Sequence, residues 1–275
     1  MSVDATLTSL ASLPKSDRLP VLFMGHGSPM NAIETNVWTE EWRQLGRELP
    51  VPTAVLCISA HWLTRGTAVT SMMYPRTIHD FQGFTRELFS IEYPAPGAPD
   101  IADATRSLIS STTVHADHNW GLDHGAWSVL RQMFPDASVP VVQLSIDYHQ
   151  PGSYHVHIGQ QLQALRDHGV LILGSGNLVH NLGMIAWDHI ADPGYAYSWA
   201  EEANSLFKFQ LLSRDIDRLT NVADFNAAQK LAVPTPDHYW PMLYALGATR
   251  PNEEPQFFTD SAVGGSLTMT SVRWG

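Results

Sequence analysis

Basic residues and cysteines are scarce in this chain of 275 residues. Lys and Arg together number 16 against 27 Asp and Glu, which gives a formal net charge of −11. Nucleic acid and anionic lipid surfaces both attract basic proteins, so this balance argues against either as a partner. The single cysteine, Cys57, excludes an intrachain disulfide framework. Its place in an apolar run predicts a buried, inert thiol and fits a reducing, cytoplasmic location.

Long apolar runs are also missing, although 44% of the residues are apolar, enough to bury a sizeable core. No run approaches the roughly 20 residues that span a bilayer. The first residues lack the charged start and the apolar stretch of a signal peptide. We therefore expect no membrane association. Residues 1–17 are predicted to form a loose N-terminal extension and residues 18–275 a single catalytic domain, because neither a linker nor a repeat interrupts the chain.

Two common catalytic signatures are absent as well. The nucleophile elbow G-x-S-x-G of serine hydrolases does not occur, and Ser175 in the stretch GSGN lacks the right spacing. Neither G-x-x-x-x-G-K-[ST] nor G-x-G-x-x-G is present, which removes the usual phosphate-binding loops. What the chain does have in quantity is histidine, with 13 residues.

Short apolar runs that end in glycine or polar residues are typical of buried parallel strands. The chain has such runs at residues 19–24, 53–60, 139–146 and 170–177. Alternating patterns predict a further strand at 67–74 and a last edge strand at 266–274. Apolar spacing and stop signals predict helices within 37–49, 101–110, 124–134, 154–169, 197–213 and 236–247. This alternation indicates an α/β fold, a mostly parallel central sheet flanked by helices on both faces.

Three of the buried strands lead into a histidine. His26 stands between two glycines after the first strand, His61 follows the second, and His180 follows the run 170–177. Ligands of open parallel sheets bind outside the carboxyl ends of the strands, so these side chains should meet at one rim. His124 and His238, each at the predicted start of a helix, are candidates for the same place. We interpret the group as a metal site at the C-terminal ends of the strands, since neutral imidazole binds zinc, copper, iron and nickel.

The remaining histidines have no such placement. His155 and His157 lie two residues apart in a predicted helix, where they do not face each other, and are predicted to be surface residues. The same interpretation applies to His79, His115, His118, His149, His168 and His189. Because the chain has only one cysteine, a structural zinc site of the cysteine type is excluded.

Five stretches together resemble one known family. They are LFMGHGSPMN (22–31), ISAHW (58–62), DHGAWSVL (123–130), GSGNLVHN (174–181) and PDHYWPMLYALG (236–247). In combination they are similar to the class III extradiol ring-cleavage dioxygenases. The nearest resemblance is to the single-chain 4,5-DOPA dioxygenase group, which is related to the catalytic subunit of protocatechuate 4,5-dioxygenase. Each motif is weak alone, but five in order along nearly the whole chain are specific.

The resemblance implies a non-haem Fe(II) enzyme that cleaves a catecholic substrate beside its two hydroxyls, using O₂. His26 and His61 match the metal-binding histidines of the family. His238 occupies the position where the wider superfamily carries a carboxylate, and members of the 4,5-DOPA dioxygenase-like group can hold zinc with His180 as a fourth ligand. This departure leaves Fe(II) and Zn(II) open as the native metal, because zinc competes well for imidazoles. Asp237 is a candidate ligand or hydrogen-bond partner.

The resemblance also implies roles in catalysis and in substrate binding. His180 matches the acid/base histidine, and His124 matches the histidine that borders the O₂ and substrate pocket. The candidate substrate contacts adjoin the motifs, with packing as the alternative for each aromatic side chain. They are Ser28, Trp62, Asn177 and Tyr239.

Two other functions stay open. A metal-binding relative without ring-cleaving activity would use the fold as a binding scaffold, although a scaffold does not need the complete set of five histidines. A zinc hydrolase needs a carboxylate general base near the metal, for which Asp123 and Asp237 are the candidates. Nine tryptophans fit either a homo-oligomer interface or a filled core.

Overall fold

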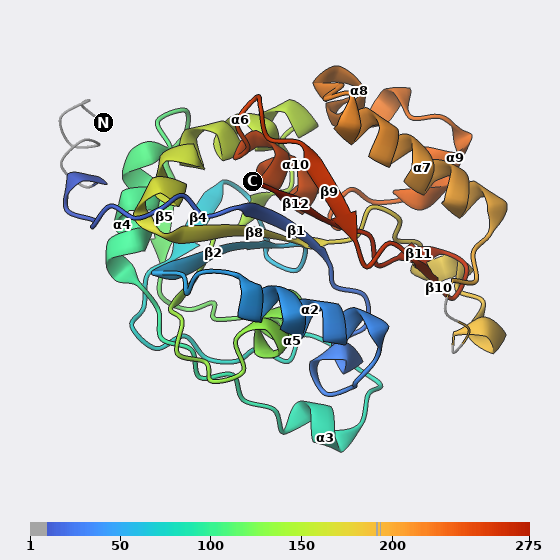
Figure 1. The fold of residues 1–275 in the computed structure, drawn as a ribbon, viewed down its shortest axis with the longest axis horizontal. Helices are drawn as coiled ribbons and strands as arrows, with labels where there is room; N and C mark the ends of the chain where they lie inside the picture. The colour runs from blue at the N-terminus through green and yellow to red at the C-terminus, as the bar shows by residue number, and fades with distance from the viewer. Residues whose placement is uncertain (1–9, 191, 193) are drawn as a thin grey trace.

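A six-stranded sheet forms the centre of the computed structural model, which describes residues 10–190, 192 and 194–275 (Figure 1). From one edge to the other its strands are β6 (Val141–Gln143), β2 (Ala54–Ser59), β8 (Val170–Gly176), β1 (Val21–Gly25), β12 (Ser271–Trp274) and β9 (Pro255–Phe258). The first four strands run parallel, whereas β12 is antiparallel to β1 and β9 is antiparallel to β12. The predicted α/β fold with a mostly parallel sheet is confirmed.

Alternate residues of the central strands feed two separate hydrophobic cores. In β1, Val21 and Phe23 belong to one core, and Leu22 and Met24 belong to the other. Side chains of a strand point to opposite faces in turn. Because every residue of β1, β2 and β8 is buried, both faces of the sheet must be covered.

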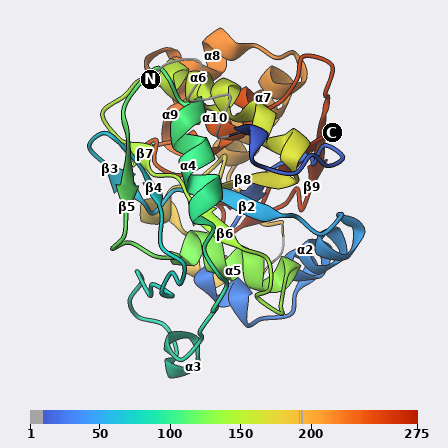
Figure 2. The same ribbon diagram turned by 90° about the vertical axis from the view of Figure 1, so that its left-hand side faces the viewer.

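Helices cover both faces of the sheet (Figure 2). One face carries α2 (Val37–Glu48), which begins after the capping residue Asn36, and α5 (His124–Met133). The other face carries α4 (Pro99–Leu108), α6 (Gly152–Leu162) and α10 (Trp240–Gly247). The core on this face, which contains Val21 and Phe23, also includes residues of α7 (Ser198–Leu212), α8 (Ile216–Thr220) and α9 (Ala227–Ala232). The short helices are η1 (Pro29–Ala32), α3 (Arg86–Phe89), η2 (Gln163–His168), η3 (Leu182–Met184), η4 (Trp187–His189) and η5 (Val222–Asp224).

Within the described residues, three two-stranded sheets lie outside the central sheet. They pair β3 (Leu63–Thr64) with β7 (Ile146–Asp147), β4 (Thr67–Thr70) with β5 (Val114–Asp117), and β10 (Ala262–Val263) with β11 (Leu267–Thr268). The predicted strand 67–74 therefore ends early and does not join the central sheet. The predicted strand 139–146 is divided, because β6 pairs with β2 whereas Ile146 pairs with Leu63 of β3.

Two predictions about the C-terminal part of the chain are corrected. The last strand, β12, lies between β1 and β9 instead of at an edge, because β9 adds an unexpected strand outside it. The last helix begins at Trp240 rather than at residue 236, because residues 236–239 form a bend and a turn before it.

Two histidines that were predicted to lie on the surface are buried. His155 is fully buried, with its ring centroid 4.5 Å from that of Trp240 and 5.1 Å from that of Tyr244. His168 is also buried, and its Nδ1 lies 3.1 Å from the carbonyl oxygen of Leu13. Both rings face the core because the helical segments that carry them are covered on that side by other parts of the chain.

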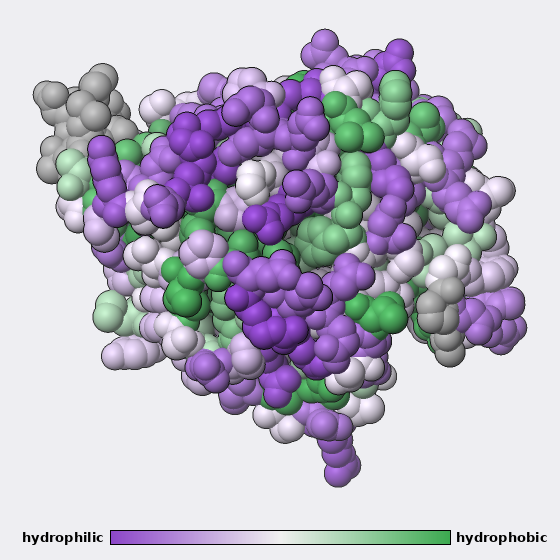
Figure 3. All heavy atoms as spheres, viewed as in Figure 1, coloured by the Kyte–Doolittle hydropathy of each residue, from purple (hydrophilic) through white to green (hydrophobic). Residues whose placement is uncertain are grey.

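The predicted N-terminal extension lies partly outside the described residues, which begin at Leu10. In its described part, Leu13 is buried and joins the core, so this part contacts the domain. Among the described residues, no helix combines the length and the apolar character needed to cross a membrane. Hydrophilic side chains cover much of the face shown in Figure 3, with scattered apolar residues between them.

Candidate metal centre

The register of the sheet brings His26 and His61 to the same rim. Met24 of β1 pairs with Ser175 of β8, and Ser175 pairs with Ser59 of β2. His26 and His61 each follow two residues after these paired positions, so the parallel strands carry both side chains to one level. Their Nε2 atoms lie 3.3 Å apart.

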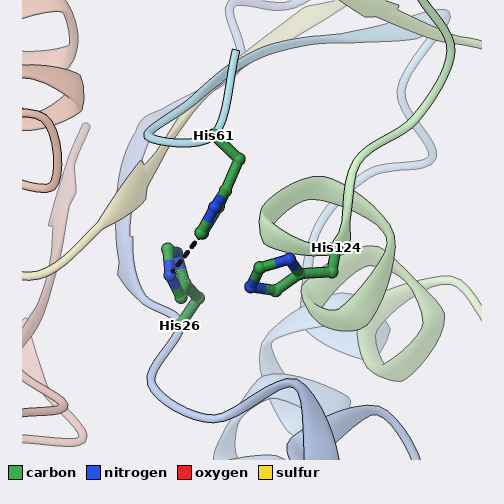
Figure 4. A group of neighbouring side chains, drawn as sticks. All are labelled: His26, His61 and His124. Atoms are coloured by element: carbon green, nitrogen blue, oxygen red, sulfur yellow. Dashed lines mark hydrogen bonds between the residues drawn. The ribbon is translucent and has the colours of Figure 1, made fainter. Parts of the chain in front are cut away.

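The structure brings five histidines together at this rim. The ring centroids of His26 and His61 are 5.1 Å apart, and the His238 centroid lies 5.2 Å and 5.0 Å from them. The His124 centroid lies 3.8 Å from that of His61, and the His180 ring stacks on His238 at 3.5 Å. Figure 4 shows the group His26, His61 and His124, in which one ring nitrogen from each residue lies within 4.8 Å of the other two.

His124 reaches the rim from the first residue of α5. Asp123 caps this helix, since its Oδ1 accepts hydrogen bonds from the Ala126 backbone nitrogen at 3.1 Å and from Ser59 Oγ at 2.6 Å. A Cβ atom at Gly125 would lie 2.4 Å from Ser59 Oγ and 2.8 Å from His61 Cδ2. Only glycine therefore lets α5 approach the end of β2 this closely.

His238 is seated on the end of β8 by its backbone. The Asn177 backbone nitrogen donates to the His238 carbonyl oxygen at 2.8 Å. A Cβ atom at Gly176 would lie 2.1 Å from the same oxygen, so the close approach requires glycine. The backbone nitrogen of His180 donates to the Ala232 carbonyl at 2.8 Å. These contacts bring the segment before α10 and the segment after β8 to the rim together.

A serine determines which nitrogen of His26 carries the proton. Ser175 Oγ donates its only proton to the Gly125 carbonyl at 2.5 Å. It must then accept from His26 Nδ1, which lies 3.0 Å away. With the proton on Nδ1, the Nε2 atom of His26 has a free lone pair.

Two carboxylates lie close to the Nδ1 atoms of other rings. Asp80 Oδ1 lies 3.0 Å from His124 Nδ1, and Asp80 Oδ2 lies 3.4 Å from His61 Nδ1. Asp237 Oδ1 lies 3.0 Å from His238 Nδ1. Burial alone would raise the pKa of each carboxyl, but the hydrogen bonds from His124 and His238 lower the pKa of both below its ordinary value. Because an ionised carboxylate only accepts, the hydrogen bond to Asp237 keeps the proton of His238 on Nδ1 and leaves its Nε2 free for a metal. The Nδ1 atoms of His61 and His124 lie near Asp80 without forming a hydrogen bond to it.

The facing Nε2 atoms of His26 and His61 fit a metal ion. His26 Nε2 accepts, so the 3.3 Å contact is a hydrogen bond when His61 carries its proton on Nε2 and a pair of acceptors open to a cation when His61 carries it on Nδ1. Burial, and then the neighbouring histidines, hold the pKa of both rings well below the usual value, so a proton is disfavoured there. Two nitrogens bound to one tetrahedral ion at 2.0–2.1 Å are about 3.3–3.4 Å apart. The donor set therefore suits a divalent metal with affinity for imidazole.

His180 is held differently from His26 and His238. No side chain among the described residues forms a hydrogen bond with its ring, which only stacks on His238 with an interplanar angle of 5°. Burial, and then the neighbouring His238, lower the pKa of His180 to about 3. The ring is therefore neutral at pH 7 and able to accept a proton.

Three of the residues predicted to contact substrate have distinct surroundings. Ser28 is exposed and caps η1. Trp62 is buried and stacks on Trp120, with ring centroids 5.6 Å apart. Asn177 is buried and donates from Nδ2 to the Thr268 carbonyl, but its Oδ1 has no partner among the described residues. Asn177 thus offers a free acceptor beside the His238 backbone.

The prediction for Tyr239 is corrected by its surroundings. Its phenol donates to the Leu219 carbonyl at 3.0 Å, and its ring packs against Phe207 and Phe225 at centroid distances of 5.0 and 5.6 Å. Burial raises the pKa of this phenol well above its ordinary value. Tyr239 is a packing residue that connects α8 to the start of α10, and we remove it from the substrate contacts.

Both carboxylates that were named as bases for a hydrolase are engaged in hydrogen bonds. Asp123 is fully buried, and its Oδ2 accepts from Gln143 Nε2 at 2.7 Å and from Trp120 Nε1 at 3.4 Å. Its Oδ1 is occupied by the helix cap described above. Asp237 is bonded to the backbone and the ring of His238. The first of the two has no oxygen left to activate water.

Sequence reasoning missed Asp80 and Phe81, and it considered Ser175 only as a nucleophile. The ring of Phe81 stands edge-on to His124 with the centroids 5.5 Å apart. Asp80 and Phe81 lie in the loop between β4 and α3, which follows no strand of the central sheet. A strand-end signal could not find them. Ser175 had a signal, because a polar residue in a fully buried strand needs a buried partner.

With the fold and the group of histidines described, the chain can be compared with known protein families. A family model described as the catalytic LigB subunit of aromatic ring-opening dioxygenase matches residues 20–268. The chain belongs to this family, and the resemblance to extradiol dioxygenases is confirmed. Membership implies a small aromatic substrate and O₂.

Two relatives and one solved structure are similar to this chain over most of its length. It is 45% identical to a 4,5-DOPA dioxygenase extradiol from Escherichia coli (strain K12), over 94% of this chain and 96% of the relative. It is 35% identical to a 4,5-DOPA dioxygenase extradiol from Beta vulgaris, over 92% and 95% of the two chains. The crystal structure of an uncharacterized protein from Escherichia coli K12 matches with a TM-score of 0.80 at 41% identity, covering 94% of this chain and 100% of the other.

Proposed function

We propose that this protein is an Fe(II)-dependent extradiol dioxygenase that uses O₂ to cleave the ring of a catecholic, DOPA-like substrate. The observation that carries the proposal is the approach of the Nε2 atoms of His26 and His61 to 3.3 Å within a cluster of five histidines. The relatives that are named 4,5-DOPA dioxygenase extradiol support the substrate class.

His26, His61 and His238 are the proposed metal ligands. His26 and His238 are hydrogen-bonded through Nδ1 with Nε2 left free, and the Nε2 of His61 faces that of His26. Bound Fe(II) would supply the redox chemistry that O₂ requires. Zn(II) also binds imidazole and would be able to occupy the site in the purified protein, but it has no redox chemistry. His180 is a further ligand candidate in a zinc form. We assign His124 to the O₂ and substrate pocket, because the aromatic ring of Phe81, in the loop before α3, packs against its imidazole.

Two nearby carboxylates compensate for the presence of His238 at the position where the wider superfamily has a carboxylate ligand. Neutral ligands alone would leave the full charge of a divalent ion in a buried place. Asp80 and Asp237 each lie one imidazole away from the proposed ion and are ionised. Such partners of metal-binding histidines raise the basicity of the ligand nitrogen. The negative charge is thus supplied through the rings.

His180 is the residue that would take a proton from a catechol hydroxyl. Its ring is neutral, and it stacks 3.5 Å from His238, directly beside the proposed ion. The imidazolium that forms would be stabilised by Asp237, whose charge acts to raise the pKa of His180. The same ring can later return the proton, as general acid/base catalysis requires.

Three side chains are proposed to contact the substrate. The unpartnered Oδ1 of Asn177 is available to accept a hydrogen bond from a substrate hydroxyl. Trp62 would provide an aromatic wall, and its stack with Trp120 fixes the orientation of that wall. Ser28 is exposed two residues after His26, where it is available to a polar group at the entrance.

The test is oxygen uptake by protein of defined metal content. The metal is removed with chelator, the protein is reloaded anaerobically with Fe(II) or Zn(II), and L-DOPA, catechol or protocatechuate is added in air. With Fe(II) we expect O₂ consumption in step with a yellow ring-cleavage product, fastest with L-DOPA. With Zn(II) we expect neither, because zinc has no redox chemistry.

The other two functions make different predictions in the same experiment. Inactivity with both metals at full occupancy, across a wide panel of catechols, would favour a metal-binding scaffold. Hydrolysis of an ester or amide by the zinc form without O₂ uptake would favour a hydrolase.

A further inference from the structure

One carboxylate contacts two histidines that approach the centre from different elements. His61 follows β2, and His124 begins α5 (Figure 4). Asp80 Oδ2 lies 3.4 Å from His61 Nδ1, while Asp80 Oδ1 lies 3.0 Å from His124 Nδ1. The same Oδ1 accepts from the His124 backbone nitrogen at 2.9 Å. Each oxygen of Asp80 thus serves one histidine.

We propose that Asp80 is a positioning residue that orients His61 and His124 together and keeps both rings in the Nδ1–H form. An imidazole without a partner has two ring orientations and two tautomers, and only one combination presents a free Nε2 inward. Asp80 removes the other combinations for both rings at once. The proposal rests on the metal centre of the proposed function but not on the dioxygenase reaction.

The loop that carries Asp80 is itself fixed against the centre. Phe81, the next residue, stands edge-on to His124 and packs against Trp127 of α5 at a centroid distance of 6.1 Å. Asp80 therefore acts as a connection between a loop outside the sheet and two elements that end at the rim. A change at Asp80 should alter the centre without unfolding the sheet.

The two oxygens allow a test that separates the two histidines. In Asp80→Asn, the remaining oxygen can still accept the hydrogen bond from the His124 backbone nitrogen and stay beside His124 Nδ1, so the new NH₂ group faces His61 Nδ1–H, donor against donor. We expect His61 to lose its Nδ1–H form while His124 keeps it. Both rings should lose it in Asp80→Ala. Ring ¹⁵N NMR spectra of the metal-free protein report the tautomers directly, without a metal to fix the proton of His61 on Nδ1.

Zinc affinity provides the second readout, measured by competition with a chelator. Loss of such a partner of a metal-binding histidine lowers metal affinity about 10- to 100-fold, and we expect this range for Asp80→Asn. Asp80→Glu keeps a carboxylate and should lie nearer to the wild type. The matched control is Asp192→Asn, which alters an exposed histidine–carboxylate pair, His189 Nδ1 to Asp192 Oδ2 at 2.8 Å, and should change neither readout.

The outcomes distinguish this proposal from the proposed function. Unchanged zinc affinity and an unchanged His61 tautomer in Asp80→Asn would overturn the positioning role. So would a fall in affinity with both tautomers intact, which would mean that Asp80 acts only through loop packing. If the tautomer and affinity changes occur as expected while the Fe(II)-loaded wild type consumes no O₂, the positioning role stands and the dioxygenase function fails.

Discussion

His238 and His180 lie face to face with ring centroids 3.5 Å apart, yet they are held in different ways. His238 is bonded through Nδ1 to Asp237, and its carbonyl accepts from the backbone of Asn177. The ring of His180 has no hydrogen bond to a side chain among the described residues. His26 resembles His238 in this respect, because its Nδ1 is hydrogen-bonded to Ser175, while His61 and His124 have Nδ1 beside the Asp80 carboxylate at 3.4 and 3.0 Å.

This difference separates two kinds of chemistry. A ring that is tied through Nδ1 has one tautomer and one direction, which suits a metal ligand. An acid/base ring must gain and lose a proton in each cycle, and a fixed partner on one nitrogen would oppose the change. The contrast between the tied rings and His180 therefore predicts that their removal has different consequences.

Removing a tied ring that binds the metal should have the largest effect. In His26→Ala or His61→Ala we expect metal binding to be abolished, because each variant lacks one of the two nitrogens that face each other at 3.3 Å. His238→Ala should behave in the same way. The metal-to-protein ratio after dialysis, determined by elemental analysis, measures the effect, and full occupancy in His26→Ala or His61→Ala would contradict the assignment of the site.

His124→Ala is the comparison variant for this experiment. As a pocket residue, His124 should be dispensable for metal occupancy but needed for turnover. Its ring is nevertheless grouped with those of His26 and His61. Loss of metal in His124→Ala, with retention in His238→Ala, would replace His238 by His124 in the ligand set.

Removing the untied ring should leave the metal and slow the reaction. In His180→Ala we expect Fe(II) to stay bound while turnover falls about 10²- to 10⁴-fold, the range for loss of a general acid or base. Metal content and oxygen uptake are measured on the same sample. If His180→Ala loses its metal instead, His180 is a true ligand and the contrast with His238 is wrong.

Much of the metal centre could be predicted because its histidines lie close in sequence to the ends of buried strands. His26 and His61 come within two residues of the ends of β1 and β2, two parallel strands that both pair with β8 and end at the same level, so a sequence pattern is enough to bring them together. Asp80 could not be predicted in this way. Its position depends on how the loop before α3 folds over α5, and no periodic pattern of the sequence records that contact.

Burial on the faces of helices and the order of the outer strands were less predictable for related reasons. His155 looks like a surface residue until α10 covers it with Trp240 and Tyr244. The final strand looked like an edge because β9, a four-residue strand that begins with a proline, has a weak strand pattern of its own. In each case the deciding partner is distant in the sequence.

The smallest effect is expected for a substitution of Tyr239, the residue that follows His238. In Tyr239→Phe the ring still packs between Phe207 and Phe225, but the Leu219 carbonyl loses its hydrogen bond, so the free energy of unfolding should fall by about 1–3 kcal/mol. Denaturant unfolding measures this change, and the Fe(II) content and the KM for the catechol should stay at the wild-type values. Because Tyr239 follows His238 directly, the variant also shows what holds that ring. A raised KM with unchanged stability would return Tyr239 to the substrate contacts, whereas a loss of metal would mean that His238 depends on the packing behind it more than on Asp237.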